Sequence, residues 1–212
     1  MTKYTEIKGQ TIQVLATDPS DLIVGQVWYN STSSTFKSAV EEASSPAWSS
    51  GGTMNTGRKQ LAAAGTQTAG LAFSGMDEGN TKRNTEEYNG STWTTAANLS
   101  LSRYYAGGHG TQTAGLCSGG FENRLSTEEY DGTSWASGGT LTGGRFQHGS
   151  AGTQTAGLGF GGYKYGDGVT SSTIEYDGST WSDGGNLSNN RRYLAGAGTQ
   201  TAGLAFGGNG PS

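Results

Sequence analysis

The chain has 212 residues, with 38 glycines, 3 prolines and a formal net charge of −4. It has no basic stripe and no run of 18 apolar residues, so we expect neither a nucleic-acid partner nor membrane insertion. Hydrophobic residues make up 32% and aromatic residues 10% of the chain, which favours narrow β-layers over helix bundles. Since no stretch has a helical apolar period, the sequence predicts an all-β fold.

The first 47 residues differ from the remainder. Residues 1–20 are predicted to form an N-terminal docking segment, because residues 11–15 alternate between polar and apolar as a strand does. Residues 21–47 are predicted to supply closing strands and a connection. In this region, residues 27–36 are similar to a segment that recurs later in the chain, with a longer turn and with Phe36 in place of tryptophan.

A repeat occupies the chain from residue 48 onward. The heptapeptide Gly-Thr-Gln-Thr-Ala-Gly-Leu occurs four times, at spacings of 45, 42 and 46 residues. Self-similarity at this period indicates one structural unit used repeatedly. We therefore divide the chain into repeats 48–92, 93–134, 135–180 and 181–212, which begin at Trp48, Trp93, Trp135 and Trp181.

Each repeat is predicted to contain four short strands. In the first repeat these cover residues 60–64 and 68–73, a third strand ending at Tyr88 and a fourth beginning near Trp93. Asn-Gly and Asp-Gly pairs follow the third strands and are strong hairpin signals, because both turn positions need positive φ. Four strands in about 45 residues are typical of a propeller blade. The tyrosines that end the third strands are Tyr88, Tyr130 and Tyr176.

The order of these elements resembles the kelch repeat over about residues 48–208. An arginine precedes the first strand, a glycine pair closes the second, a tyrosine ends the third and a tryptophan begins the fourth. The resemblance implies a β-propeller of about four four-stranded blades, closed by the strands of residues 21–37; the alternative is that subunits complete one another's edges. The arginines are Arg58, Arg103, Arg145 and Arg191.

These arginines have two interpretations. They form structural ion pairs or hydrogen bonds between blades with the repeated Glu87, Glu129 and Glu175, or they form a ring that binds an anion near the axis. The single Cys117 stands where other repeats have Ala or Gly, so we expect a small buried residue. Because His109 and His148 have no metal-ligand or triad pattern around them, we expect no metal, no cofactor and no catalytic site.

Length varies between repeats in one place, the loop joining the second and third strands. The spacing from the closing glycine to the tyrosine is 13, 10 or 14 residues. Variable loops on a rigid scaffold often bind ligands, although they are also tolerated as insertions. The candidate ligand-binding residues in these loops are Asp77, Glu78, Lys82, Arg83, Phe121, Glu122, Arg124, Tyr163, Lys164, Tyr165 and Asp167.

Residues 17–30, Thr-Asp-Pro-Ser-Asp-Leu-Ile-Val-Gly-Gln-Val-Trp-Tyr-Asn, together with the heptapeptide repeats, resemble virion proteins of tailed phages, especially those that infect marine cyanobacteria. The resemblance implies a non-enzymatic structural protein of the virion, a tail-fibre or appendage module that binds a host-surface glycan or protein. Other virion proteins would be its partners, and homo-oligomers are expected. The alternatives are an architectural subunit that decorates the capsid or connects tail parts, and an enzyme that acts on host polysaccharide.

Overall fold

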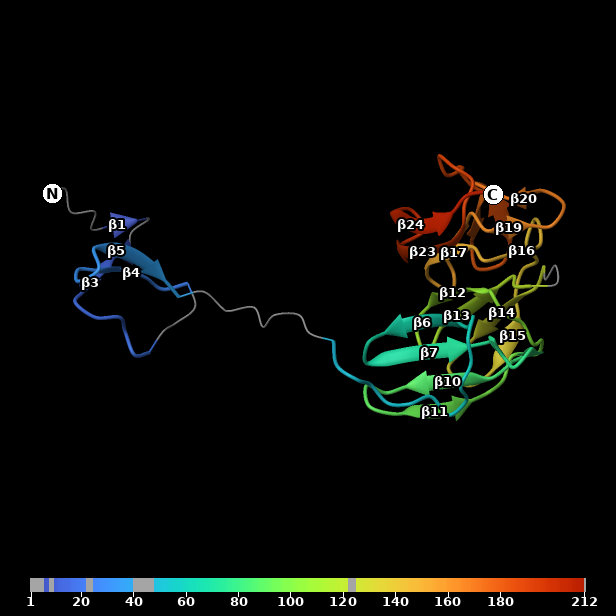
Figure 1. Cartoon of the computed structure of the whole chain (residues 1–212), viewed down its shortest axis with the longest axis horizontal. Coiled ribbons are helices and arrows are strands. Elements are labelled where there is room, and N and C mark those ends of the chain that lie inside the picture. Colours follow the sequence, from blue (N-terminus) through green and yellow to red (C-terminus); the bar gives the residue numbers. More distant parts are fainter. Residues whose placement is uncertain (1–5, 8–9, 22–24, 40–47, 122–124, 212) are drawn as a thin grey trace. The chain divides into compact units, whose positions relative to one another are not determined.

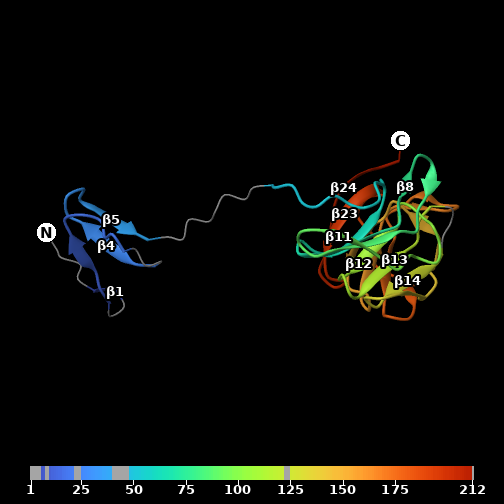
Figure 2. The same ribbon diagram turned by 90° about the horizontal axis from the view of Figure 1, so that it is seen from below.

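The structure is a computed structural model that describes residues 6–7, 10–21, 25–39, 48–121 and 125–211. Every regular element in these ranges is a β-strand, which confirms the all-β prediction. The chain divides into two compact units, residues 1–49 and residues 50–212, and Figures 1 and 2 show the strands of each.

The first unit contains two small sheets. Strand β1 (Glu6–Ile7) pairs with β2 (Gln10–Thr11), and β4 (Val27–Asn30) lies between β3 (Gln13–Leu15) and β5 (Thr35–Ser38). The Asp18 carboxylate holds this second sheet together by accepting hydrogen bonds from the Trp28 indole, the Asn30 amide and Lys37. The predicted docking segment and the predicted closing strands therefore share one sheet.

The second unit contains three four-stranded antiparallel sheets, each made of three strands from one of the first three repeats and the strand that begins at the tryptophan of the next repeat. Their strands pair in chain order. Sheet 1 contains β6 (Ala62–Thr66), β7 (Ala69–Phe73), β10 (Thr85–Tyr88) and β11 (Trp93–Ala96); sheet 2 contains β12 (Gly107–Gly110), β13 (Gly115–Ser118), β14 (Thr127–Tyr130) and β15 (Trp135–Ser137); sheet 3 contains β17 (Gly149–Gly152), β18 (Gly157–Phe160), β21 (Thr173–Tyr176) and β22 (Trp181–Asp183).

The fourth repeat is a two-stranded hairpin of β23 (Arg192–Gly198) and β24 (Gly203–Asn209). Short strands extend the loops of the other repeats: β8 (Met76–Asp77) pairs with β9 (Asn80–Thr81), and β19 (Tyr163–Lys164) lies between β16 (Arg145–Phe146) and β20 (Gly168–Val169). The four strands predicted per repeat are thus present in three repeats. Closure of these sheets into a four-bladed ring remains a prediction.

The turn between the third and fourth strands follows directly from local chemistry. Gly90, Gly132 and Gly178 have φ values of 91°, 92° and 91°, a conformation that glycine adopts without steric cost. The preceding Asn or Asp side chain accepts hydrogen bonds from the two backbone N–H groups that follow the glycine. This Asx arrangement explains why each hairpin forms where the sequence predicts it.

The first strands of successive repeats, β6, β12, β17 and β23, lie side by side. The position two residues before each heptapeptide is Ala63, Gly108, Ser150 or Gly196. A Cβ added to Gly108 would lie 2.4 Å from the Ala63 carbonyl oxygen, and one added to Gly196 would lie 2.5 Å from the Ser150 carbonyl oxygen. Only very small residues permit this approach, which accounts for part of the high glycine content.

The heptapeptide glutamine fastens each repeat to the one before it. The Gln112 amide donates to the Gly70 carbonyl at 3.1 Å and to the Tyr88 carbonyl at 2.8 Å. Gln154 and Gln200 make the same two bonds to the second and third sheets. These bonds satisfy backbone carbonyls next to the turns, so the glutamine serves the scaffold.

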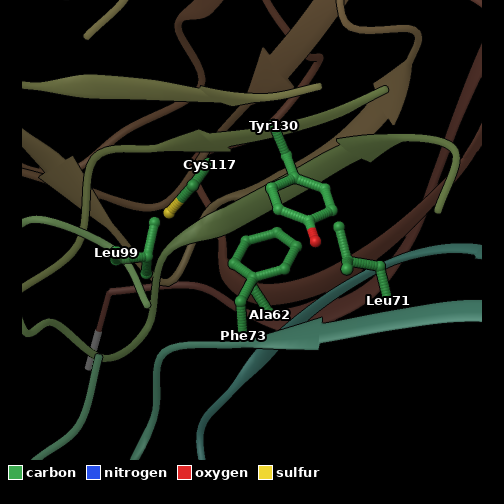
Figure 3. Close-up of a cluster of buried hydrophobic side chains, with 6 residues drawn as sticks. All are labelled: Ala62, Leu71, Phe73, Leu99, Cys117 and Tyr130. Carbon is green, nitrogen blue, oxygen red and sulfur yellow. The ribbon is translucent and has the colours of Figure 1, made fainter. Parts of the chain in front are cut away.

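Tyrosine and tryptophan side chains form a second connection between neighbouring sheets. The Tyr130 hydroxyl donates to the Glu87 carboxylate at 2.7 Å, and the Trp135 indole N–H donates to the Thr85 hydroxyl at 3.0 Å. Tyr176 and Trp181 repeat this pattern on Glu129 and Thr127. Figure 3 shows the core between the first two sheets, which includes Leu71, Phe73, Leu99, Cys117 and Tyr130.

Cys117 is fully buried, as predicted, and burial raises the pKa of its thiol to about 11. The predicted partners of the arginines, Glu87 and Glu129, were wrong. Arg58 and Arg103 pair with Glu86 and Glu128 of their own sheets, while Glu87 and Glu129 bind the tyrosines of the following sheet. Arg145 has Ile174 at the corresponding position and donates to the carbonyls of Gly161 and Ser172.

The two histidines lie in one buried hydrogen-bonded chain. His109 Nδ1 donates to the Ala151 carbonyl at 2.8 Å, so its Nε2 accepts from the Ser118 hydroxyl at 3.0 Å; Ser118 Oγ lies 3.2 Å from His148 Nε2, which therefore donates to it. Because its Nε2 accepts a hydrogen bond, the His109 ring must be neutral in this arrangement. Burial lowers the pKa of His109 to about 4, and burial together with nearby Arg145 lowers the pKa of His148 well below its usual value.

We therefore expect stability to fall as the pH drops below about 6.5, where unfolded histidine takes up a proton and the buried ring does not. His109 alone contributes roughly 3 kcal/mol of this loss by pH 4, the depression of its pKa converted at 1.36 kcal/mol per unit. Urea unfolding of the wild type and of His109→Asn between pH 7 and pH 4.5 checks it. The same pH slope in both proteins would contradict it.

Candidate functional site

Seven aromatic rings form a continuous series in the second unit, which we call the aromatic surface. Neighbouring ring centroids lie 5.5 Å apart for Tyr193 and Tyr105, 5.1 Å for Tyr105 and Tyr104, and 4.9 Å for Tyr104 and Phe121. The series continues through Phe146, 5.3 Å from Phe121, to Tyr163 and Tyr165 at 5.1 and 5.9 Å from Phe146. Its members are Tyr104, Tyr105, Phe121, Phe146, Tyr163, Tyr165 and Tyr193.

The backbone explains how these rings come together. In each repeat, the residue after the conserved arginine pairs with the residue after the closing glycine. The Phe121 N–H donates to the Tyr104 carbonyl at 2.9 Å, and Phe146 is paired with Tyr163 across β16 and β19. The corresponding pairs in the outer repeats are Lys59 with Met76 and Arg192 with Asn209. The two middle repeats thus supply most of the rings, and basic residues flank them.

The next residue of each repeat turns the backbone beside this surface. Gln60, Tyr105, Gln147 and Tyr193 all have φ between 57° and 59°, a conformation rare outside glycine. In the last three of these residues, the N–H donates to the carbonyl of the same position one repeat earlier, at 3.0, 3.0 and 2.9 Å. The Gln60 and Gln147 amides donate to the Tyr105 and Tyr193 hydroxyls at 2.6 Å. These bonds fix both tyrosines, and burial, the largest effect, raises the pKa of Tyr105 to about 12.

The surface has exposed rings at both ends. Tyr165 is 41% and Tyr193 is 49% exposed, whereas Phe146 in the middle is buried. The Arg192 guanidinium lies 5.3 Å from the centre of the Tyr193 ring, within the range of a cation–π interaction. Contiguous exposed apolar groups on a soluble domain commonly mark interaction sites. An exposed ring face can stack on a ligand, and a cation beside it can bind the hydroxyl groups of that ligand.

The structure brings some of the predicted loop residues together. Phe121, Tyr163 and Tyr165 all belong to the aromatic surface. Lys164 forms an ion pair with Asp167 at 2.8 Å beside them. Glu122 and Arg124 lie outside the described residues.

The remaining predicted residues belong to the first loop, which forms the separate β8–β9 hairpin. Lys82 and Asp77 pair with each other at 2.9 Å, and Glu78 occupies the tight turn with a φ of 39°. The Arg83 carbonyl accepts the Leu99 N–H, and the Arg103 N–H donates to the Lys82 carbonyl, so this loop is fastened to residues 99–103. The Lys82 and Asp77 side chains therefore bind each other, and the backbone of Lys82 and Arg83 joins the loop to the next repeat.

Sequence reasoning missed Tyr104, Tyr105, Phe146 and Tyr193. A signal was present, since the two positions after the repeated arginine change in every repeat, from Lys-Gln to Tyr-Tyr, Phe-Gln and Arg-Tyr. Such variation beside an invariant residue indicates positions that the scaffold does not constrain. Variation in loop length alone does not point to these positions.

The chain matches no protein-family model, and no curated protein is significantly similar to it. Among the residues that the structure describes, no cluster of three or more His, Cys, Asp or Glu side chains could hold a metal ion. In the same ranges, no helix is long and apolar enough to cross a membrane. The aromatic surface is therefore the principal candidate site.

Proposed function

We propose that this protein is a non-enzymatic module of a phage virion, a tail-fibre or appendage component, whose aromatic surface binds a glycan of the host cell. The observation that carries the proposal is the continuous series of rings ending in the exposed Tyr165 and Tyr193. The resemblance of residues 17–30 and of the repeats to tailed-phage virion proteins supports the biological setting.

The chemistry of the surface suits a sugar. The apolar C–H face of a pyranose ring can pack on the face of an aromatic side chain. Tyrosine and tryptophan present such faces at many recognition surfaces. The Tyr165 hydroxyl and the Asp167 carboxylate at one end of the surface, and the Arg192 guanidinium at the other end, can bond sugar hydroxyls. Backbone hydrogen bonds hold Tyr105 and Tyr193 in place before any ligand arrives, so little conformational entropy is lost on binding.

A different observation favours a second function, that of an architectural subunit. Leu204 is 61% and Phe206 is 47% exposed on the terminal hairpin, whereas Leu71 and Phe73 at the same repeat positions are buried. An exposed apolar face built on the pattern of a buried interface suits contact with another virion protein.

Replacing exposed rings tests the glycan proposal. We expect Tyr165→Ala and Tyr193→Ala each to weaken binding to immobilised cyanobacterial lipopolysaccharides at least tenfold, because each removes a stacking face. Surface plasmon resonance measures the affinity, and circular dichroism confirms the fold.

The matched control is Phe36→Ala, which removes a 59% exposed ring of the first unit and should leave binding unchanged. Equal binding by the wild type and both tyrosine variants would overturn the proposal. Retained self-association or virion incorporation in those variants, with no glycan binding by any protein, would instead support the architectural function.

A further inference from the structure

The fourth repeat is half of a sheet. Its inner strand β23 pairs with β24, as β6, β12 and β17 pair with β7, β13 and β18. The second strands of the other repeats pair on their far side with β10, β14 and β21, whereas among the described strands β24 pairs with β23 alone. The outer edge of β24 therefore presents unpaired backbone N–H and C=O groups, which can accept another strand.

A groove lies beside this open edge. It has a volume of about 290 Å³ and runs between the third sheet and the terminal hairpin. Its apolar walls include Leu158, Phe160, Leu187 and Ala205, and its polar groups include Thr173 and Glu175. The groove is thus mainly apolar and contains the Thr173 hydroxyl and the Glu175 carboxylate.

The two preceding interfaces show what fills this space elsewhere. Between the first and second sheets, the Trp135 ring packs 5.0 Å from Phe73 and its indole binds Thr85, while the Tyr130 hydroxyl binds Glu87. Trp181 and Tyr176 occupy the next interface in the same way. By the repeat spacing, Phe160, Thr173 and Glu175 are the counterparts of Phe73, Thr85 and Glu87.

The polar groups of the groove have different partners from their counterparts in the earlier repeats. Thr173 donates to the Gly185 carbonyl at 2.5 Å, whereas Thr85 and Thr127 accept from an indole. Glu175 has no hydrogen-bond or ion-pair partner among the described residues, whereas Glu87 and Glu129 each accept a tyrosine hydroxyl. A carboxylate set beside an apolar groove is suited to a donor from an incoming chain.

We propose that this groove binds a β-hairpin of a partner protein, one with a tyrosine and a tryptophan five residues apart. The hairpin adds to the edge of β24 as a third and fourth strand, as in other cases of recognition by strand addition. Its tyrosine hydroxyl donates to Glu175 and its indole N–H to Thr173. The partner is thus recognised by the same contacts that join successive repeats.

The hairpins that the structure describes in this chain do not meet this requirement. Those carrying Tyr88, Tyr130 and Tyr176 are already paired in their own sheets. In β4–β5, Tyr29 packs 5.1 Å from Phe36, which resembles the Tyr–Trp pairs, but phenylalanine has no N–H to donate to Thr173. None of the hairpins among the described residues therefore supplies the complete set of contacts.

The probe for this proposal is a fluorescein-labelled synthetic peptide with the sequence of residues 171–184, which contains Tyr176 and Trp181. We expect saturable binding to the full-length chain, measured by fluorescence anisotropy. Peptides with Tyr176→Ala or Trp181→Ala should bind at least tenfold more weakly.

A double-mutant cycle tests the hydrogen bond itself. Tyr176→Phe in the peptide should weaken binding to the wild-type chain, and should have no further effect on binding to Glu175→Ala, because that protein has lost the acceptor. Leu204→Ala is the matched control, since it changes the opposite face of the hairpin and should leave the affinity unchanged.

Three results would overturn the proposal: no saturable binding to the full-length chain at millimolar peptide, equal binding of the alanine peptides, or binding that appears only in a Phe36→Ala chain. The last result would mean that the β4–β5 hairpin, and no partner protein, occupies the groove. Loss of glycan binding by the aromatic surface would leave this experiment unaffected.

Discussion

Replacing Arg103 with alanine is expected to lower the free energy of unfolding by roughly 3–5 kcal/mol, the usual effect of removing one partner of a buried ion pair. Arg103 is 1% exposed and pairs with the 2% exposed Glu128, and it also donates to the Gly119 and Ser126 carbonyls at 3.1 and 2.9 Å. The variant leaves the buried carboxylate without its cation and removes one hydrogen-bond donor from each of the two carbonyls. Urea unfolding monitored by tryptophan fluorescence measures the loss.

The repeat offers a matched control in Arg191→Ala. Arg191 occupies the same repeat position, but the one hydrogen bond described for its side chain is a 3.4 Å contact with the Gly207 carbonyl at an exposed site. We expect this variant to change the free energy of unfolding by less than about 0.5 kcal/mol, as most surface substitutions do. Similar losses in both variants would contradict the assignment of a structural role to the buried pair.

The substitution Leu116→Ala is expected to lower the free energy of unfolding by roughly 2–5 kcal/mol, the range for truncating a buried leucine. Leu116 is completely buried in the core with Leu141, Ile174, Tyr176 and Trp181. Its methyl group also contacts the heptapeptide glycine of the next repeat, Gly157, where an added Cβ would lie only 3.0 Å away. Thermal or urea unfolding of the purified variant measures the effect.

Leu204→Ala is the control, because it makes the same chemical change at the same repeat position. Leu204 is 61% exposed on the terminal hairpin, and its truncation should change stability by less than about 0.5 kcal/mol. If the two variants lost equal stability, the outer face of the terminal hairpin would be covered in solution, contrary to the structure.

These two pairs show that residues at the same repeat position can contribute very different amounts to the free energy of unfolding. Leu116 and Leu204 belong to the same heptapeptide, and Arg103 and Arg191 to the same repeat position. Their position in the repeat does not distinguish them. Their burial depends on whether another repeat follows, because each repeat buries its face only against a neighbour.

Some features could be predicted because their causes lie within a few residues. The Asn-Gly and Asp-Gly hairpins, the strand order within each repeat and the burial of Cys117 all followed from spacing and from local turn chemistry. The choice between Glu86 and Glu87 as the arginine partner did not, since adjacent residues of a strand face opposite sides of the sheet. Only the stacking of the sheets decides which side faces Arg58.

The sequence by itself determined an all-β chain of repeats, because strand alternation and turn residues act over short distances. Only the tertiary structure brought Tyr104, Phe121, Phe146 and Tyr193 into one surface, since their contacts join residues that are 17 to 88 positions apart. It also showed the open groove of the fourth repeat, whose shape depends on which strands lie beside it. Local propensities define the repeat, whereas packing between repeats decides which of its surfaces remain free to bind.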